Sequence, residues 1–148
     1  MKLKVDKLTV KQLFKFFIEA RGEDLKEFWI PTHERFEDAT IEDFAKTLCL
    51  YDEDTNDVYC IWGVEDTGEM DKIIWMLCTN TVEHNPVAFL RFCKEYLKGL
   101  LEDNKILVNW VWLGNDLHVK WLKWMGAKFG ETIIINGEPF QYFYFMKE

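Results

Sequence analysis

The sequence predicts one mixed α/β (α+β) domain, residues 1–148, built around a central sheet of about seven strands. The chain has 148 residues, of which 49% are apolar and 16% aromatic, and this is enough to fill one hydrophobic core. Strand-like and helix-like segments alternate without a linker, a repeat or a low-complexity stretch. A strand–helix–strand unit in the middle implies at least one parallel, right-handed crossover.

The chain opens with a strand and a helix. Residues 2–7 alternate polar and apolar, as a short strand does. Thr9 and Gln12 have the spacing of a capping box, and the amphipathic helix that follows ends near Gly22. The apolar positions of this helix are Val10, Leu13, Phe14, Phe17 and Ile18.

The next segments are a less regular stretch, a short helix and three strands. We expect Pro31 to prevent a continuous helix within residues 23–39. Thr40 is placed to cap a helix with Ile41, Phe44, Ala45 and Leu48 on its apolar face. The predicted strands are Cys49–Asp52, Val58–Val64 and Lys72–Cys78, joined by polar turns. The last of them is apolar on both faces, as a central buried strand is.

The second half alternates again. After the loop Thr79–His84, Asn85 and Pro86 are the cap and first position of a helix that runs to about Glu102. A strand, a helix and a closing hairpin follow: Ile106–Leu113, a helix opened by Gly114 and Asn115 and stopped at Gly126, then Ala127–Ile135 and Phe140–Met146. Asn136-Gly137 between the last two strands is typical of a tight hairpin turn.

Charge and cysteine content restrict the partners and the compartment. The formal net charge is −8, whereas nucleic-acid binders are usually basic, so we expect no nucleic-acid partner. No apolar run is long enough to span a membrane, and the N-terminus lacks the pattern of a signal peptide. The four cysteines form no C-x-x-C pair, and we expect free thiols in a reducing compartment.

The element order resembles that of the GNAT N-acetyltransferase family, and one motif supports this resemblance. The helix after the fifth strand keeps the family's Asn-to-Gly spacing, from Asn115 to Gly126. His118 stands at the family's small-residue position, Leu122 at its Tyr position and Ala127 at its Phe position. The resemblance implies a GNAT-like, mixed and mostly antiparallel sheet with helices on both faces.

The last 40 residues, roughly, resemble the internal virion protein A-like proteins of short-tailed phages (podoviruses), which look like degenerate GNAT domains. The similar stretches are Asn109–Asn115, His118–Lys120, Leu122–Lys123, Met125–Phe129 and Asn136–Phe143. This resemblance implies a phage protein made in the cytoplasm of a bacterial host, with the virion as a second location and particle assembly as its context. It does not by itself imply catalysis.

A GNAT enzyme usually holds the pyrophosphate of coenzyme A on a glycine-containing loop after strand four. The loop here has no glycine, Glu83 adds a negative charge, and Pro86 lacks an N–H. We therefore expect no cofactor, with acetyl-CoA bound only if the chain is a divergent enzyme. The residues that would then contact it are Met76, Leu77, Cys78, Thr79, Thr81, His84 and Asn115.

The general acid of the family is also missing. Leu122 occupies the position of the catalytic Tyr and has no proton to donate. His118 and Tyr96 are the substitutes that the sequence offers, although His118 is also explained as a structural helix residue. Cys78 near His84 invites a Cys–His nucleophile, but a buried inert thiol explains Cys78 better. No His, Cys or carboxylate spacing predicts a metal site.

Lysines and tryptophans alternate near the last helix. The positions are Lys120, Trp121, Lys123, Trp124 and Lys128. They predict either a face that docks on another protein or rings packed on the sheet beside solvated lysines.

Three functions remain open. The first is non-catalytic: a phage GNAT-fold protein that acts in virion morphogenesis or binds a phage or host protein, with the opening between strands four and five as a candidate site. The second is a divergent CoA-dependent N-acetyltransferase. The third, a nucleic-acid module, is disfavoured by the net charge of −8. The oligomeric state is not predicted.

Overall fold

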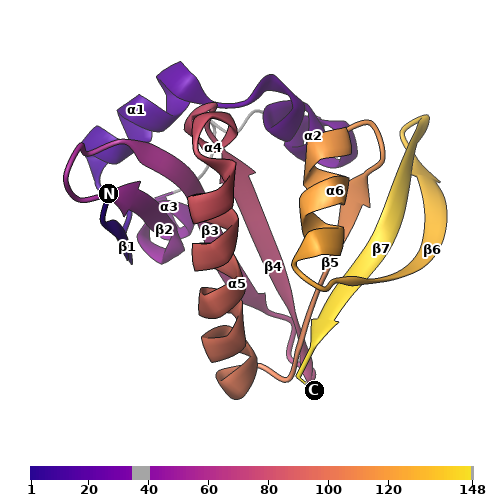
Figure 1. The fold of residues 1–148 in the computed structure, drawn as a ribbon. Coiled ribbons are helices and arrows are strands. Elements are labelled where there is room, and N and C mark those ends of the chain that lie inside the picture. Colours follow the sequence, from indigo (N-terminus) through magenta and orange to yellow (C-terminus); the bar gives the residue numbers. More distant parts are fainter. Residues whose placement is uncertain (35–40, 148) are drawn as a thin grey trace. The chain divides into compact units, whose positions relative to one another are not determined.

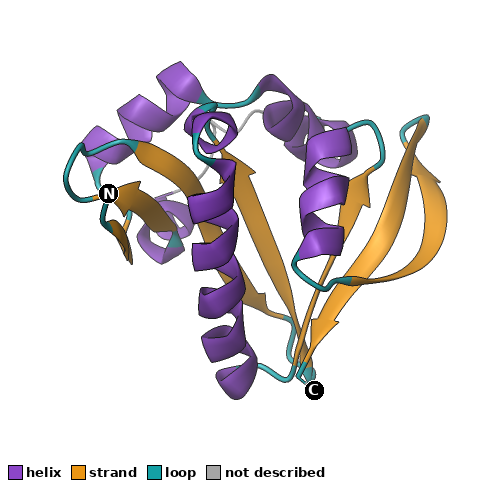
Figure 2. Cartoon of the chain, viewed as in Figure 1, coloured by secondary structure: helices purple, strands orange, loops and turns teal. Residues whose placement is uncertain are grey.

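The computed structural model describes residues 1–34 and 41–147. Its elements, labelled in Figure 1 and coloured by type in Figure 2, are β1 (Leu3–Lys7), α1 (Val10–Glu19), α2 (Gly22–Thr32), α3 (Ile41–Lys46), β2 (Leu48–Asp52), β3 (Val58–Asp66), β4 (Asp71–Cys78), α4 (Thr81–His84), α5 (Pro86–Asp103), β5 (Ile106–Trp112), α6 (Asp116–Trp124), β6 (Lys128–Ile135) and β7 (Glu138–Met146). No helix in this part of the chain is both long and apolar enough to cross a bilayer.

The strands form one mixed sheet. Hydrogen bonding gives the strand order β1-β2-β3-β4-β5-β7-β6. β1 with β2, β2 with β3, β5 with β7 and β6 with β7 are antiparallel pairs. β4 and β5 are parallel, with residues 71–73 beside residues 106–108, and α5 connects them. The predicted seven-stranded, mostly antiparallel sheet with a parallel crossover is confirmed.

The chain divides into two compact units. Unit 1 comprises residues 1–63 and 75–89, and unit 2 comprises residues 64–74 and 90–148. β3 and β4 are each divided between the units, with one end in unit 1 and the other end in unit 2. Each unit has its own apolar core, and each is described by itself.

The core of unit 1 gathers around Phe16, which is fully buried. The other buried members are Leu8, Cys49, Val58, Ile61 and Leu77. Half-buried side chains of α1 (Leu13, Phe17), α2 (Leu25, Phe28) and α3 (Phe44) pack against them. The strands of unit 1 therefore supply one side of this core and its helices supply the other.

The core of unit 2 joins β5, β7, α5 and α6. Its buried members are Leu97, Leu107, Val111, Leu122, Phe143 and Phe145. Leu122 thus serves as a core residue of α6. At the end of the parallel ladder, the side chain of Asn109 on β5 donates Nδ2–H to the carbonyl oxygen of Ile74 at 2.7 Å. The side chain of Asn109 thus gives the carbonyl of Ile74 a hydrogen-bond donor one residue beyond the paired residues 71–73 of β4.

Several local signals in the sequence are confirmed. The hydroxyl of Thr9 accepts from Gln12 N–H at 3.2 Å, and the Gln12 side chain accepts from Thr9 N–H at 3.0 Å, so the capping box is complete. Asn136 and Gly137 both have positive φ, 47° and 84°, as a type I′ hairpin turn requires. Gly126, with φ of 97°, follows the C-terminal end of α6.

Three predictions about the helices are corrected or extended. Pro31 does not prevent a helix, because it lies in the last turn of α2, where the missing N–H removes at most one helical bond before His33 ends the helix in the left-handed conformation. Leu48 begins β2 and is not on the short helix. Residues 81–84 form the single turn α4 inside the predicted loop. The predicted cap at Thr40 lies outside the described residues.

The predicted apolar stripe of α1 is divided between core and surface. Leu13 and Phe17 pack on the core, whereas Val10, Phe14 and Ile18 are exposed. Phe16, which is not among the predicted apolar positions, is fully buried. The apolar arc of this helix is wider than the face that the core can cover, and the burial of Phe16 fixes which part points inward.

Candidate functional site

The segment of residues 78–85, where the sequence predicts a degenerate phosphate loop, lies entirely in unit 1. Cys78 ends β4, the single turn α4 follows, and Pro86 begins the long helix α5. A phosphate-binding loop works by presenting unpaired backbone N–H groups to the anion. An N–H that already donates to an acceptor within the protein is not available to such an anion.

Six consecutive backbone N–H groups, from Cys78 to Glu83, all donate within the protein. The acceptors are Asp24 Oδ2 for Cys78 (2.6 Å), Tyr59 O for Thr79 (2.9 Å), Glu19 O for Asn80 (2.8 Å), Thr79 Oγ1 for Thr81 (3.3 Å), Thr79 O for Val82 (3.3 Å) and Asn80 O for Glu83 (3.1 Å). All of these acceptors belong to unit 1. A phosphate would have to displace an existing hydrogen bond to gain any one of these donors.

The hydroxyl of Thr79 is likewise committed. Thr79 is fully buried, and its Oγ1–H donates to the carbonyl oxygen of Val58 at 2.6 Å, with Tyr59 O at 3.2 Å. The same oxygen accepts from Thr81 N–H. Thr79 therefore connects the end of β4 to β3, and its hydroxyl hydrogen is already donated within the protein.

The residues between α1 and α2 pair with the end of β4 at this point. Ala20 forms an isolated antiparallel bridge with Thr79, and Arg21 N–H donates to the carbonyl oxygen of Cys78 at 2.9 Å. Asp24, in the first turn of α2, accepts from Cys78 N–H. Both backbone groups of Cys78 are thus occupied by residues that follow α1.

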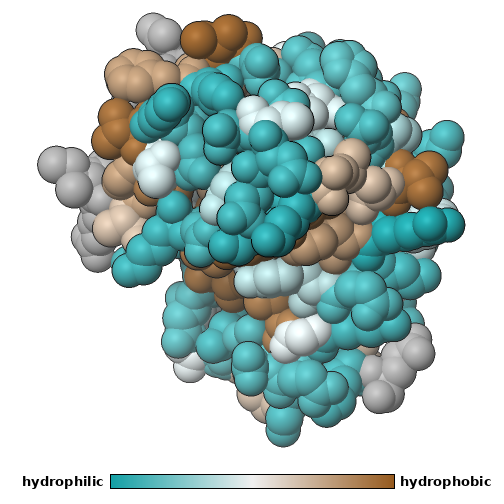
Figure 3. Space-filling view, turned by 60° about the vertical axis from the view of Figure 1, so that its left-hand side comes forward, coloured by the Kyte–Doolittle hydropathy of each residue, from teal (hydrophilic) through white to brown (hydrophobic). Residues whose placement is uncertain are grey.

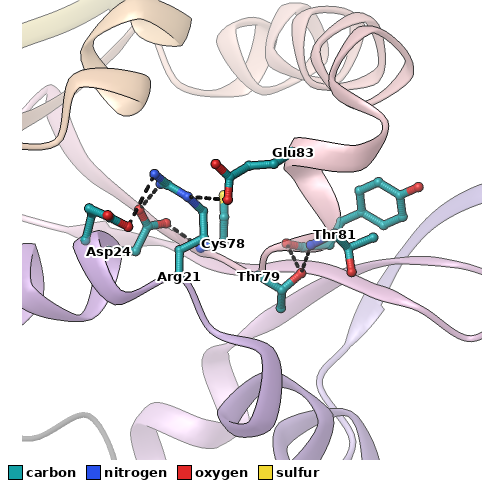
Figure 4. Close-up of polar contacts among 8 residues, drawn as sticks. Arg21, Asp24, Cys78, Thr79, Thr81 and Glu83 are labelled. Carbon is teal, nitrogen blue, oxygen red and sulfur yellow. Dashed lines mark hydrogen bonds and ion pairs between the residues drawn. The ribbon is translucent and has the colours of Figure 1, made fainter.

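A buried ion pair between Arg21 and Asp24 stabilises this contact between the start of α2 and the end of β4. The side chains of Arg21 and Asp24 are 6% and 5% exposed, and Arg21 Nη1 lies 2.5 Å from Asp24 Oδ1. Glu23 and Glu83 each place a carboxylate oxygen 3.6 Å from the same guanidinium. Figure 4 shows Arg21 between the Asp24 and Glu83 carboxylates, with Cys78 beside them.

The charge of this cluster disfavours an anion. One guanidinium and three carboxylates give a formal charge of +1 − 3 = −2. Phosphate groups bind where positive charge and free donors converge. The Arg21 cluster (Arg21, Glu23, Asp24 and Glu83) supplies neither, because its one cation is already surrounded by carboxylates.

The thiol of Cys78 fits the buried, inert alternative. A hydrogen bond with the Cys60 side chain lowers the pKa of Cys78, while burial and the Asp24 carboxylate raise it, and the net shift is upward. A raised pKa keeps the thiol protonated, and a protonated thiol is a poor nucleophile. His84 is exposed at the end of α4, and no contact recorded in the described residues links it to Cys78.

The substitute acids lie in unit 2. Burial raises the pKa of Tyr96, which is 36% exposed on α5 and stacks on Phe92 with ring centroids 5.9 Å apart. His118 is half-buried on α6, with its ring 6.4 Å from that of Phe143 in an edge-on arrangement. Asn115 is fully buried; its N–H donates to Trp112 O and its carbonyl oxygen accepts from Val119 N–H. Asn115 thus precedes the first turn of α6 and His118 lies beside the Phe143 ring, and the ligand and acid roles predicted for them stay predictions.

The five residues of the predicted docking face are divided between the surface and the interior of unit 2. Lys120 and Lys123 line a surface hollow of about 330 Å³ together with Leu113, Asp116 and Val119. Trp124 is 47% exposed, with Lys94 Nζ 4.8 Å from its ring centroid, and Lys128 is exposed on β6. Trp121 is buried, so it packs inside unit 2 and is not part of the face. The helical period turns Trp121 inward when Lys120 and Lys123 point outward.

Sequence reasoning missed Arg21 and Asp24. Both lie at the start of a helix that the sequence did not predict, and a buried Arg–Asp pair leaves no periodic pattern to detect. The one available signal was an Arg followed three residues later by an Asp, beside Gly22. Among residues 1–34 and 41–147, no group of three His, Cys, Asp or Glu side chains is arranged to hold a metal ion.

Comparison with known sequences gives a phage family. The model of the family described as "Bacteriophage T7, probable scaffold protein Gp13" matches residues 49–133, more than half of the chain. The probable scaffold protein gp13 of Escherichia phage T7 is 40% identical over 55 residues, which are 37% of this chain and 39% of that protein. The similarity thus spans less than half of that relative's length.

Comparison with solved structures gives the fold. An acetyltransferase of the GNAT family from Bacillus anthracis superposes with a TM-score of 0.69 at 13% identity, over 99% of this chain and 95% of that one. Spermidine N-acetyltransferase from Vibrio cholerae, solved with CoA and spermine, gives 0.69 at 12% identity, over 99% and 96%. The ribosomal-protein-S5-alanine acetyltransferase of Vibrio fischeri gives 0.67 at 7% identity, over 100% and 94%. The chain therefore has the GNAT fold, and identities this low extend to the fold alone.

Proposed function

The chain belongs to the family of the bacteriophage T7 probable scaffold protein Gp13, and from this premise we propose that it acts in phage particle assembly by binding another protein, without acetyl transfer. The observation that carries the non-catalytic part is the occupation of all six N–H groups from Cys78 to Glu83. A GNAT scaffold whose N–H groups are occupied from Cys78 to Glu83 retains the fold and lacks these donors for holding a pyrophosphate.

The narrower assignment is to the internal virion protein A-like proteins of short-tailed phages. The family match and the GNAT fold both support a phage protein of this kind. On this proposal the chain is made in the cytoplasm of the bacterial host and associates with the assembling virion. Its partner is a phage or host protein, and the exposed part of the docking face, Lys120, Lys123, Trp124 and Lys128, is one surface for it.

The alternative is a divergent CoA-dependent N-acetyltransferase. Its support is the superposition of the whole chain on acetyltransferases, one of them solved with CoA. It would require acetyl-CoA to bind without the N–H groups of residues 78–83, next to a cluster of formal charge −2. It would also require Tyr96 or His118 as the acid, and the raised pKa of Tyr96 makes that hydroxyl a weaker acid.

The assembly role is tested in a phage that encodes this chain. The double charge reversal Lys120→Glu/Lys123→Glu should reduce the yield of complete particles while the protein accumulates to its normal level. The matched control is Lys98→Glu/Lys105→Glu, which reverses two exposed lysines elsewhere in unit 2. Particles of normal number and composition from a phage lacking the whole chain would contradict a role in assembly.

A further inference from the structure

Three large apolar side chains on α1 are directed to solvent. Val10 is 60% exposed, Phe14 66% and Ile18 83%. Because they are four residues apart, they lie along one side of the helix. We call these three residues the α1 stripe. Single exposed apolar residues are normal, but several in a row on one helix mark an interaction site more often.

Hydrophilic residues predominate on one face of the molecule (Figure 3). Teal, hydrophilic residues cover most of the face shown in Figure 3, and brown, hydrophobic residues reach the surface in only a few places. On α1 itself, the half-buried Leu13 and Phe17 lie between the stripe and the core of unit 1. The apolar surface of the helix is therefore continuous from the core to the stripe.

The position of α1 is well fixed. Its N-terminus carries the complete capping box of Thr9 and Gln12. Phe16 anchors its inner side in the core, and Lys15 Nζ donates to the carbonyl oxygen of Asn56 at 2.9 Å. A partner would meet a stripe that is already ordered, so binding would cost little ordering of this helix.

One edge of the stripe is basic. At 100° per residue, Lys11 and Lys15 follow the stripe on the side away from Leu13 and Phe17. Glu19 is the sole carboxylate of α1, and it lies farther around the helix. A chain of net charge −8 thus carries a local strip of apolar side chains with a lysine edge.

We propose that the α1 stripe binds an amphipathic helix of another protein, whose apolar side packs on Val10, Phe14 and Ile18 and whose acidic flank faces the lysine edge. The inference rests on the proposed protein-binding function, for which it names a surface and a class of partner. Apolar residues at intervals of three and four on one helix are the recognition pattern of helix-to-helix docking. The acidic flank follows from charge complementarity with Lys11 and Lys15.

Two other occupants fit this surface less well. A second copy would bring the same lysines, and an antiparallel pair of α1 helices would place lysine edge against lysine edge, which is unfavourable. An anionic membrane would attract two lysines but repel the rest of a chain that carries −8.

The test uses the whole protein and two synthetic helical peptides of about 20 residues, long enough to form a helix in water. Both peptides carry leucines on one side; one has glutamates along the flank and its twin has lysines there. Binding is followed by fluorescence anisotropy at low and at moderate salt. The acidic peptide should bind at least tenfold more tightly than its twin, and added salt should reduce the difference.

The stripe is identified by a matched pair of variants. Ile18→Glu should weaken binding of the acidic peptide at least tenfold, whereas Ile134→Glu, at a position 69% exposed on β6, should leave it unchanged. Both substitutions are on the surface, so both proteins should keep the unfolding transition of the wild type.

Several results would overturn the inference. Equal binding of the two peptides, equal loss in both variants, a wild-type dimer in sedimentation that Ile18→Glu abolishes, or binding to anionic vesicles that Ile18→Glu abolishes would each do so. The last two would identify a second copy or a membrane as the occupant. The assay contains no phage, so its failure leaves the assembly role standing, and a normal phage without this chain would leave the peptide result standing.

Discussion

The backbone N–H of Cys78 donates to the carboxylate of Asp24 at 2.6 Å, joining the end of β4 to the first turn of α2. The same carboxylate pairs with Arg21, whose own backbone N–H donates to Cys78 O. Three residues thus form a closed ring of contacts at the position where the sequence predicts a degenerate cofactor loop. The Arg21 cluster therefore serves to bind α2 to the sheet.

The substitution Asp24→Asn should destabilise the protein strongly. The amide cannot neutralise Arg21, so the buried guanidinium loses the buried carboxylate of Asp24, and the loss of a buried partner costs about 3–5 kcal/mol. The control is Glu23→Gln, since Glu23 is 58% exposed and its loss should cost no more than about 1 kcal/mol. Urea unfolding of the two variants measures both values, and equal, small effects would contradict a structural role for the Arg21 cluster.

The protein should lose stability in alkali. Burial, followed by the Asp6 carboxylate opposite it on β1, raises the pKa of Cys49 from 9.0 to about 12. A hydrogen bond to Asp6 is the first cause that raises the pKa of Tyr51 from 10.0 to about 12. The folded state then binds more protons than the unfolded state between about pH 9 and pH 12. The stability that these two groups contribute is therefore fully present below about pH 9 and is lost as the pH rises through that interval.

The free energy of unfolding, measured by urea titration at several values in this alkaline interval, tests the pH dependence. Cys49→Ala removes one of the two groups and should make the decline less steep, although the lost packing lowers stability at every pH. A free energy of unfolding that stays level or rises between about pH 9 and pH 12 would contradict the account.

Gly114 should not tolerate a side chain. A Cβ at this position would lie within 3.0 Å of the ring of Trp112, which is buried. Gly114→Ala should therefore lower stability by about 1–3 kcal/mol, as overpacking does. At Gly99 in α5 an added Cβ meets nothing within 4 Å, so Gly99→Ala should raise stability by about 0.5–1 kcal/mol. Thermal unfolding distinguishes the two, and a neutral Gly114→Ala variant would show that Trp112 can move aside.

The sequence predicts those parts of the fold that depend on local chemistry. The capping box at Thr9, the Pro86 start of α5 and the Asn136-Gly137 turn each have a signature within four residues, and all three are where the sequence places them. The parallel β4–α5–β5 connection also follows from element order. The absence of glycine after β4 predicts a loop that does not hold a pyrophosphate in the usual way, and this stays a prediction.

Features that depend on tertiary packing are not predicted. The helix α2 is missed because Pro31 reads as a break, although at the last turn its cost is small. The inward rotation of α1 is decided by Phe16, so periodicity alone could not show that Phe14 and Ile18 are exposed. The pairing of Arg21 with Asp24 depends on the contact between α2 and β4, and no local sequence pattern indicates that contact.

The central claim, that residues 78–83 have no backbone N–H left for a pyrophosphate, is tested most directly by calorimetric titration of the purified protein with acetyl-CoA at moderate salt. A CoA-binding GNAT enzyme titrated in the same buffer is the positive control. The account predicts no detectable heat of binding for this chain. A one-to-one isotherm with micromolar affinity would contradict it, because the cofactor would then have to bind despite hydrogen bonds that already occupy every N–H from Cys78 to Glu83.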